Sequence, residues 1–193
     1  MARAQDEDGG GMSLSDICVL FARKGGRAYE GEGVTQLEHA LQTAAQAEAA
    51  GSPPALIAAA LLHDLGHLLN DQGETPTLRG VDDLHQFAAL PFLRALYGDD
   101  VLGPIRMHVD AKRYLCATRA DYYAALSADS KRSLVLQGGV YSGDEASRFI
   151  GQPHAEDAVK IRLWDDLAKV AGAVTPPLAH FVPALEAAQR AAA

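Results

Sequence analysis

The chain has 193 residues, 48% of them hydrophobic, and a formal net charge of −8. This length suits one domain with a single core. Because the charge is acidic and no stretch forms a basic stripe, nucleic acid is not expected as a partner. No apolar run approaches the length of a membrane span, so a membrane is not expected either.

The predicted elements are helices throughout, because alanine is abundant and runs of β-branched or aromatic residues are few. Residues 1–12 are polar and rich in glycine, and we expect a disordered lead there and a domain over 13–193. Apolar residues recur at helical spacing over 14–24, 34–50, 54–69, from 83 with a break at Pro91, 102–117, 121–126, 144–150, 155–170 and after Pro177. Residues 27–33 and 70–80 are predicted loops, and 127–139 are mixed. The predicted fold class is all-α.

The two cysteines, Cys18 and Cys116, could form one disulfide, but no secretory signal precedes them. We therefore expect both to be reduced thiols in a cytoplasmic protein. The sequence does not indicate an oligomeric state.

Ionisable residues lie inside a very apolar predicted helix, in the stretch LLHDLGH at residues 61–67. An unpaired charge is costly in such surroundings, so ligation of a metal explains this placement better than chance. His63 and His67 are four residues apart and share a helix face. Asp64 points about 100° away from His63, so both reach one centre only if it lies against that side of the helix.

Further candidate ligands come from other predicted helices. His39 precedes the LLHDLGH helix, His85 and His108 follow it, and Asp165 belongs to a late helix. Helices that each supply one or two ligands are a recurrent way to build a metal site in a helical core. Imidazole suits iron, zinc, manganese and nickel, and a carboxylate can bridge two ions. The set suffices for two metals, with Asp64 as the natural bridge.

The motif H…HD…D of the HD superfamily is present here as His39, His63, Asp64 and Asp165. The two inserted histidines, His85 and His108, narrow the resemblance to the branch with dinuclear sites. Within that branch, the stretches YEGEGVTQLEHALQTA, LLHDLGH, VDDLHQ, HVDAKRYLC and LQGG resemble the HD-domain di-iron oxygenases of phosphonate catabolism. The resemblance extends over about residues 14–185, with HVDAKRYLC as its most specific segment.

The resemblance implies a compact single HD domain, a helical bundle with the metal site in its core. It also implies two iron ions, as an Fe(II)/Fe(III) pair. The implied ligands are His39, His63, Asp64 and Asp165 for one iron, and the bridging Asp64 with His85 and His108 for the other.

The resemblance further implies a phosphonate site and a lid. The implied phosphonate contacts are His67, Lys112, Ser130, Ser133 and Gln137. A lysine and a protonated histidine suit a phosphonate dianion. Tyr29 and Glu32 resemble a movable lid, whose tyrosine in the family can occupy the open iron position until substrate displaces it. The remaining basic residues near these motifs are interpreted as ordinary packing, surface or salt-bridge residues: Arg106, Arg113, His154, Arg162 and His180.

The implied activity is oxidative cleavage of a C–P bond, with an organophosphonate and O2 as substrates. A 1-hydroxy-2-aminoethylphosphonate would give glycine and inorganic phosphate. One alternative is the 1-hydroxy-2-(trimethylammonio)ethyl substrate, which would give glycine betaine, and Glu32, Gln36 and Glu38 are candidates for contacts to the amine. The other alternative is a divalent-metal phosphohydrolase that uses a metal-bound hydroxide.

Overall fold

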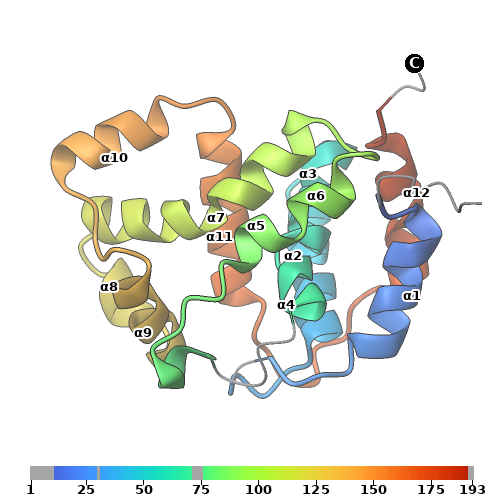
Figure 1. Cartoon of the computed structure of the whole chain (residues 1–193), viewed down its shortest axis with the longest axis horizontal. Coiled ribbons are helices and arrows are strands. Elements are labelled where there is room, and N and C mark those ends of the chain that lie inside the picture. The colour runs from blue at the N-terminus through green and yellow to red at the C-terminus, as the bar shows by residue number, and fades with distance from the viewer. Residues whose placement is uncertain (1–10, 30, 71–75, 191–193) are drawn as a thin grey trace, which may run out of the picture.

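The computed structural model describes residues 11–29, 31–70 and 76–190. These residues form α-helices and one short 3-10 helix, η1, with no strand among them (Figure 1). The elements are α1 (Leu14–Lys24), α2 (Gln36–Ala49), α3 (Pro54–Leu62), α4 (Leu65–Leu69), η1 (Pro76–Arg79), α5 (His85–Ala88), α6 (Leu90–Leu93), α7 (Asp99–Thr118), α8 (Tyr122–Ala125), α9 (Ala128–Leu136), α10 (Gly143–Ile150), α11 (Ala155–Leu167) and α12 (Leu178–Ala187). The predicted all-α fold class is confirmed.

Helix α3 is the centre of the bundle. Its sequence, PALIAAALL, is apolar on every side, and every residue from Leu56 to Leu62 is buried. A helix without a polar face must be surrounded by other helices, and α2, α7, α11 and α12 pack around it. Because α3 ends directly before His63, the ionisable pair that follows is placed in the middle of the protein.

The single helix predicted over 54–69 is wrong, because the chain leaves the helical conformation at Asp64. His63 is still helical, but Asp64 has φ −103° and ψ 11°, and a new helix, α4, begins at Leu65. In a continuous helix the two side chains would diverge by about 100°. The interruption turns Asp64 so that it reaches the same centre as His63.

Other boundaries also differ from the sequence pattern. Thr35 and Glu38 form a capping box, so α2 begins at Gln36, two residues after the start of the apolar repeat. Residues 127–139, predicted as mixed, contain the regular helix α9 with Ser127 as its N-cap. Helix α7 begins at Asp99 rather than 102, and α11 ends at Leu167 rather than 170.

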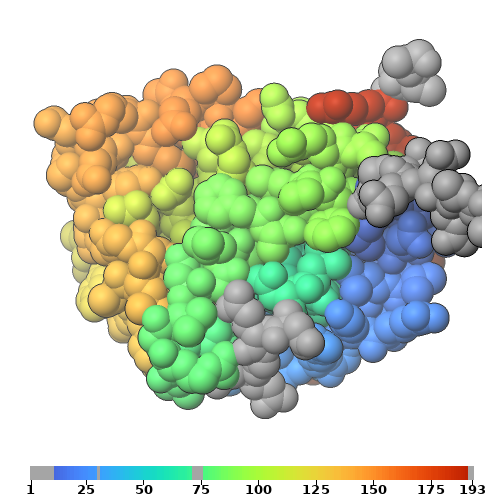
Figure 2. Space-filling view, viewed as in Figure 1, coloured from blue at the N-terminus to red at the C-terminus, as the bar shows by residue number. Residues whose placement is uncertain are grey.

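Helices α1 and α12 lie side by side at one end of the molecule, and α8, α9 and α10 lie at the other (Figure 1). The segment from η1 to α6, green in Figure 2, covers the face between them. The expected disordered lead falls largely on residues 1–10, which lie outside the described residues, while the N–H of Met12 donates to the carbonyl oxygen of Phe92 at 2.9 Å. Of the described helices, none has the length and hydropathy to cross a bilayer.

Gly66, in α4, allows the close approach of α4 to α5. A Cβ atom at this position would lie 2.0 Å from the carbonyl oxygen of His85, so the two segments would have to separate. We predict that Gly66→Ala lowers the free energy of unfolding by about 3 kcal/mol, measured by urea denaturation. Gly26→Ala is the matched control, because a Cβ atom there meets nothing within 4 Å. Equal destabilisation by the two changes would contradict the prediction.

Candidate metal centre

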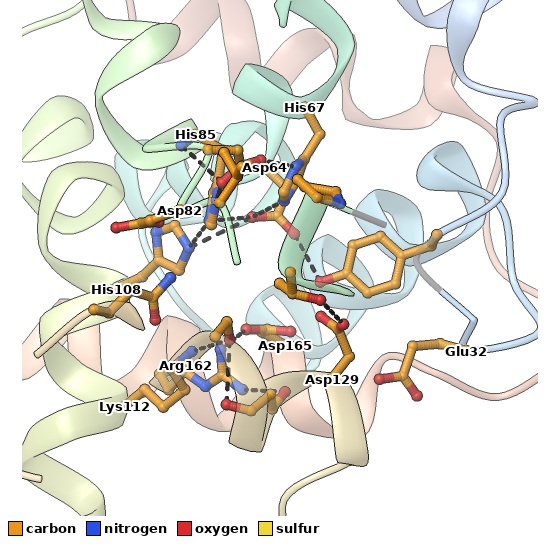
Figure 3. Close-up of a pocket in the computed structure, with 18 of the residues that line it drawn as sticks. Glu32, Asp64, His67, Asp82, His85, His108, Lys112, Asp129, Arg162 and Asp165 are labelled. Atoms are coloured by element: carbon orange, nitrogen blue, oxygen red, sulfur yellow. Dashed lines mark hydrogen bonds and ion pairs between the residues drawn. The ribbon is translucent and has the colours of Figure 1, made fainter. Parts of the chain in front are cut away.

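The structure brings together all six side chains that the sequence suggested as metal ligands. They come from five different parts of the bundle, and each is buried. The six are His39 of α2, His63 and Asp64 at the junction of α3 and α4, His85 at the start of α5, His108 of α7 and Asp165 of α11. Figure 3 shows Asp64, His85 and His108 close together at the cavity, with Asp165 beside Arg162 on another side of it.

The Asp64 carboxylate lies between two pairs of histidines. Its Oδ2 atom is 3.4 Å from Nε2 of His39 and 3.3 Å from Nε2 of His63. Its Oδ1 atom is 3.4 Å from Nε2 of His85 and also 3.4 Å from Nε2 of His108. Each carboxylate oxygen therefore faces its own pair of imidazole nitrogens, which is the arrangement that a bridging ligand of two cations requires.

The outer nitrogen of each histidine ring is held by an acceptor. In His39, His63 and His108 the Nδ1 atom lies 2.7–2.9 Å from a backbone carbonyl oxygen. In His85 it lies 2.8 Å from an oxygen of Asp83. Because these oxygens can only accept, the Nδ1 atoms donate and the Nε2 lone pairs are directed inward. Burial also lowers the pKa of His108 to about 4, so this ring is neutral at pH 7.

The inward-facing nitrogens of the four histidines face one another in two close pairs. The Nε2 atoms of His39 and His63 are 3.3 Å apart, and those of His85 and His108 are 3.1 Å apart. Two lone pairs at this separation repel each other unless a cation lies between them. Among the residues that the structure describes, the Oδ1 atom of Asp165 is buried without a hydrogen-bond partner, and it lies 3.5 Å from Nε2 of His39. The donor set therefore fits metal ions.

His67 and Asp83 support this cluster from one side. Nδ1 of His67 is 2.7 Å from Oδ2 of Asp83, whose other oxygen holds His85. Burial raises the pKa of Asp83, but the hydrogen bonds from the two histidines outweigh it and hold that pKa well below its ordinary value. The charged carboxylate thus orients one candidate ligand and one candidate substrate contact together, a role that the sequence analysis did not give to Asp83.

The expected phosphonate contacts line the same cavity. In Figure 3, Lys112 lies across the cavity from Asp64 and His67. Ser130 and Ser133 are one turn apart on α9, and Nζ of Lys112 donates to Oγ of Ser133 at 2.7 Å. Gln137, the C-cap of α9, also lines the cavity. Burial lowers the pKa of Lys112 to about 7, so an anion beside it would restore its full charge.

Arg162 lines the cavity as well, although the sequence suggested only packing or a salt bridge. The salt bridge is confirmed, because Nη1 is 2.6 Å from Oδ2 of Asp165 and Nη2 pairs with Asp166. Burial raises the pKa of Asp165, but Arg162 outweighs this effect and keeps it below its ordinary value. Nη2 of Arg162 is also 3.5 Å from Oγ of Ser130. Asp165 and Asp166 follow Arg162 by three and four residues. This helical spacing could have predicted from the sequence that Arg162 pairs with both aspartates.

The two expected lid residues reach the centre from the loop before α2. The hydroxyl of Tyr29 donates to Oδ2 of Asp64 at 2.9 Å, and its ring stacks on His39 with centroids 4.0 Å apart. Burial raises the pKa of Tyr29 well above its ordinary value, so it is a neutral phenol. Glu32 lies at the edge of the cavity in Figure 3. The glycines on either side of Glu32 have φ of +77° and +75°, which favours glycine in this loop.

Two of the three candidate amine contacts do not lie at the cavity. Glu38 is taken up by the capping box, where it accepts from the N–H of Thr35 at 2.7 Å. Gln36 is buried away from the cavity lining. Glu32 remains, and its Oε1 atom is 3.5 Å from Nζ of Lys169. Lys169 was missed because it follows the end of α11 and no motif marks it.

Comparison with known proteins agrees with this site. An HD domain model matches residues 37–128. The chain is 43% identical to a hydroxymethylphosphonate dioxygenase of Gimesia maris, over 81% of this chain and 78% of that protein. It is 38% identical to a [1-hydroxy-2-(trimethylamino)ethyl]phosphonate dioxygenase (glycine-betaine-forming) of Leisingera caerulea, over 86% of this chain and 85% of the relative. An uncharacterized protein of Acanthamoeba polyphaga mimivirus is 32% identical over 88% of this chain and 78% of that protein.

The helical bundle and its buried cluster of histidines and aspartates are those of an HD-domain metal enzyme. Within this class, the chain belongs to the family of HD-domain phosphonate dioxygenases. The resemblance found in the sequence is confirmed at the level of the family.

Removal of one histidine should weaken metal binding in one half of the cluster and leave the other half intact. We predict that His85→Ala lowers the metal content from about two ions per chain to about one, because one carboxylate oxygen of Asp64 then faces a single imidazole. Elemental analysis of purified protein measures this, and circular dichroism checks the fold. His180→Ala is the control, because His180 is exposed and paired with Glu48. Two ions per chain in His85→Ala would show that the assigned ligand is wrong.

Lys112 provides a prediction with a defined pH dependence. Its pKa of about 7 in the fold lies below its ordinary value of 10.5, so the unfolded chain binds more protons between these values. Burial of the charge therefore destabilises the protein fully below pH 7, and the cost shrinks as the pH rises toward 10.5.

We predict that Lys112→Met is more stable than the wild type at about pH 6 and that the gain fades toward about pH 10. The same variant should bind a phosphonate about tenfold more weakly, because a charge-assisted contact is lost. Urea denaturation across this pH range and calorimetric titration measure the two effects. A stability difference that is independent of pH would contradict the assignment.

Proposed function

We propose that this protein uses O2 and two iron ions to cleave the C–P bond of a 1-hydroxyphosphonate, giving a carboxylic acid and inorganic phosphate. One observation supports this most strongly: the two oxygens of Asp64 face separate histidine pairs, at 3.3–3.4 Å. A mononuclear site needs no such division. The buried Lys112 and the partly buried His67 on the same cavity supply partners for an anion.

The proposed ligand set follows the geometry of the cluster. His39, His63 and Asp165 would hold one iron, His85 and His108 would hold the other, and Asp64 would bridge them. When bound, an Fe(II)/Fe(III) pair supplies the activation of O2 and the one-electron steps that amino-acid side chains cannot perform.

The surrounding residues bind and orient the substrate. Lys112, with Ser133 beside its ammonium group, holds the phosphonate, and His67 reaches it from the opposite wall. Ser130 and Gln137 are further proposed donors. Tyr29 covers the centre by stacking on His39, so it excludes water until the substrate enters. The overall reaction balances as 1-hydroxyphosphonate plus O2 to carboxylic acid plus phosphate.

The substituent on the hydroxyl-bearing carbon defines three candidates in this class. The sequence suggested 1-hydroxy-2-aminoethylphosphonate, whose product is glycine. The relative from Leisingera caerulea favours the trimethylated substrate, whose product is glycine betaine. The relative from Gimesia maris favours hydroxymethylphosphonate, whose single carbon would leave as formate.

The test is turnover of these three phosphonates by iron-loaded protein. We expect O2 uptake and phosphate release in equal amounts with at least one of them, together with the matching acid. Phosphate release without O2 uptake would instead indicate hydrolysis. Cleavage of phosphate esters with no turnover of any phosphonate would overturn the proposal in favour of the divalent-metal phosphohydrolase.

A further inference from the structure

A second pocket lies on the surface of the protein, apart from the metal centre. It is bordered by α6, the first half of α7, the turn before α11 and the chain after α12. Among the described residues, none lines both this pocket and the metal cavity. The second pocket has a volume of about 430 Å³, against about 40 Å³ for the metal cavity. A volume of this size is typical of sites for small molecules.

Three arginines from distant parts of the chain line the second pocket. Arg94 follows α6, Arg106 belongs to α7 and Arg190 follows α12, and all three are exposed. Within the part of the chain that the structure describes, none of the three forms an ion pair, and Asp99 is the one carboxylate of the lining. The pocket is therefore cationic although the whole chain has a net charge of −8, and such a local cluster attracts anions.

His154 is held at the second pocket by two unfavourable local choices. Its φ is +66°, in the left-handed region that residues with a Cβ atom rarely adopt. Its ring lies against Gly103 of α7, because a Cβ atom at Gly103 would be 2.7 Å from Cδ2 of His154. A glycine inside a helix is itself unfavourable. Backbone strain of this kind is typical of positions where a side chain has a role in binding.

We propose that the second pocket binds an organic phosphate, with its three arginines as donors to the phosphate group. The planar fork of arginine matches phosphate oxygens and donates two parallel hydrogen bonds. The imidazole of His154 is a further donor. The buried side chains of Leu90 and Leu102 also line the pocket, and they give an uncharged organic part of the ligand an apolar surface to contact. This inference does not depend on the proposed function.

The test is calorimetric titration of the metal-loaded protein with ADP and with glycerol phosphate. Both should bind, while adenosine and glycerol, which lack the phosphate, should not. As a competitor of ADP, inorganic phosphate should be weaker by about tenfold, because it gains nothing from the apolar surface. Arg106→Gln and Arg94→Gln should each weaken the binding of ADP by about tenfold, the effect of losing one charge-assisted contact.

Arg119→Gln is the matched control, because Arg119 is an exposed arginine at the C-terminal end of the same helix as Arg106 and lies outside the second pocket; it should leave the binding of ADP unchanged. Failure of both phosphates to bind would overturn the inference, as would equal effects of Arg106→Gln and Arg119→Gln. Binding that is weakened by Lys112→Met and not by Arg106→Gln would place the ligand in the metal cavity instead. Inorganic phosphate that competes as well as ADP binds would show a site for the free ion and overturn the choice of an organic phosphate.

Discussion

The position of the Asp64 carboxylate between two pairs of histidines is the constraint on which the rest of this structure depends. Its two oxygens each face two imidazole nitrogens, at 3.3–3.4 Å, and those imidazoles belong to four different segments. The arrangement requires a helix break directly before α4 and a glycine at position 66 where α4 meets His85. The apolar helix α3 is surrounded by other helices, and its end therefore places this carboxylate at the centre of the bundle.

A buried site of this kind concentrates charges that would be costly in isolation. Among the described residues, three lysine and arginine side chains line the cavity, and they differ in how far carboxylates neutralise them. Arg162 is neutralised by Asp165 and Asp166, while the described partner of the Lys112 ammonium is the hydroxyl of Ser133. Burial and the nearby charge of Arg162 lower the pKa of Lys112 to about 7, and an anion beside this ammonium would stabilise its charged form. Stability is given up at this position, as is common where binding requires an unpaired charge.

The loop before α2 and the end of α11 meet over the centre. Tyr29 contacts His39 and Asp64, Glu32 contacts Lys169, and Lys169 contacts Asp165. Displacement of the loop would therefore break a stack, a hydrogen bond and an ion pair together.

The sequence by itself determined the helical fold class, the family and the six clustered histidines and aspartates, because apolar residues at helical spacing and the HD motif are local features of the chain. It could not place Arg162, Asp83 and Lys169 at the site or remove Gln36 and Glu38 from it. Those roles depend on side chains from distant segments meeting at a few ångströms, and on the break at Asp64. Only the tertiary structure decides such contacts, because local periodicity contains no information about which segments meet in space.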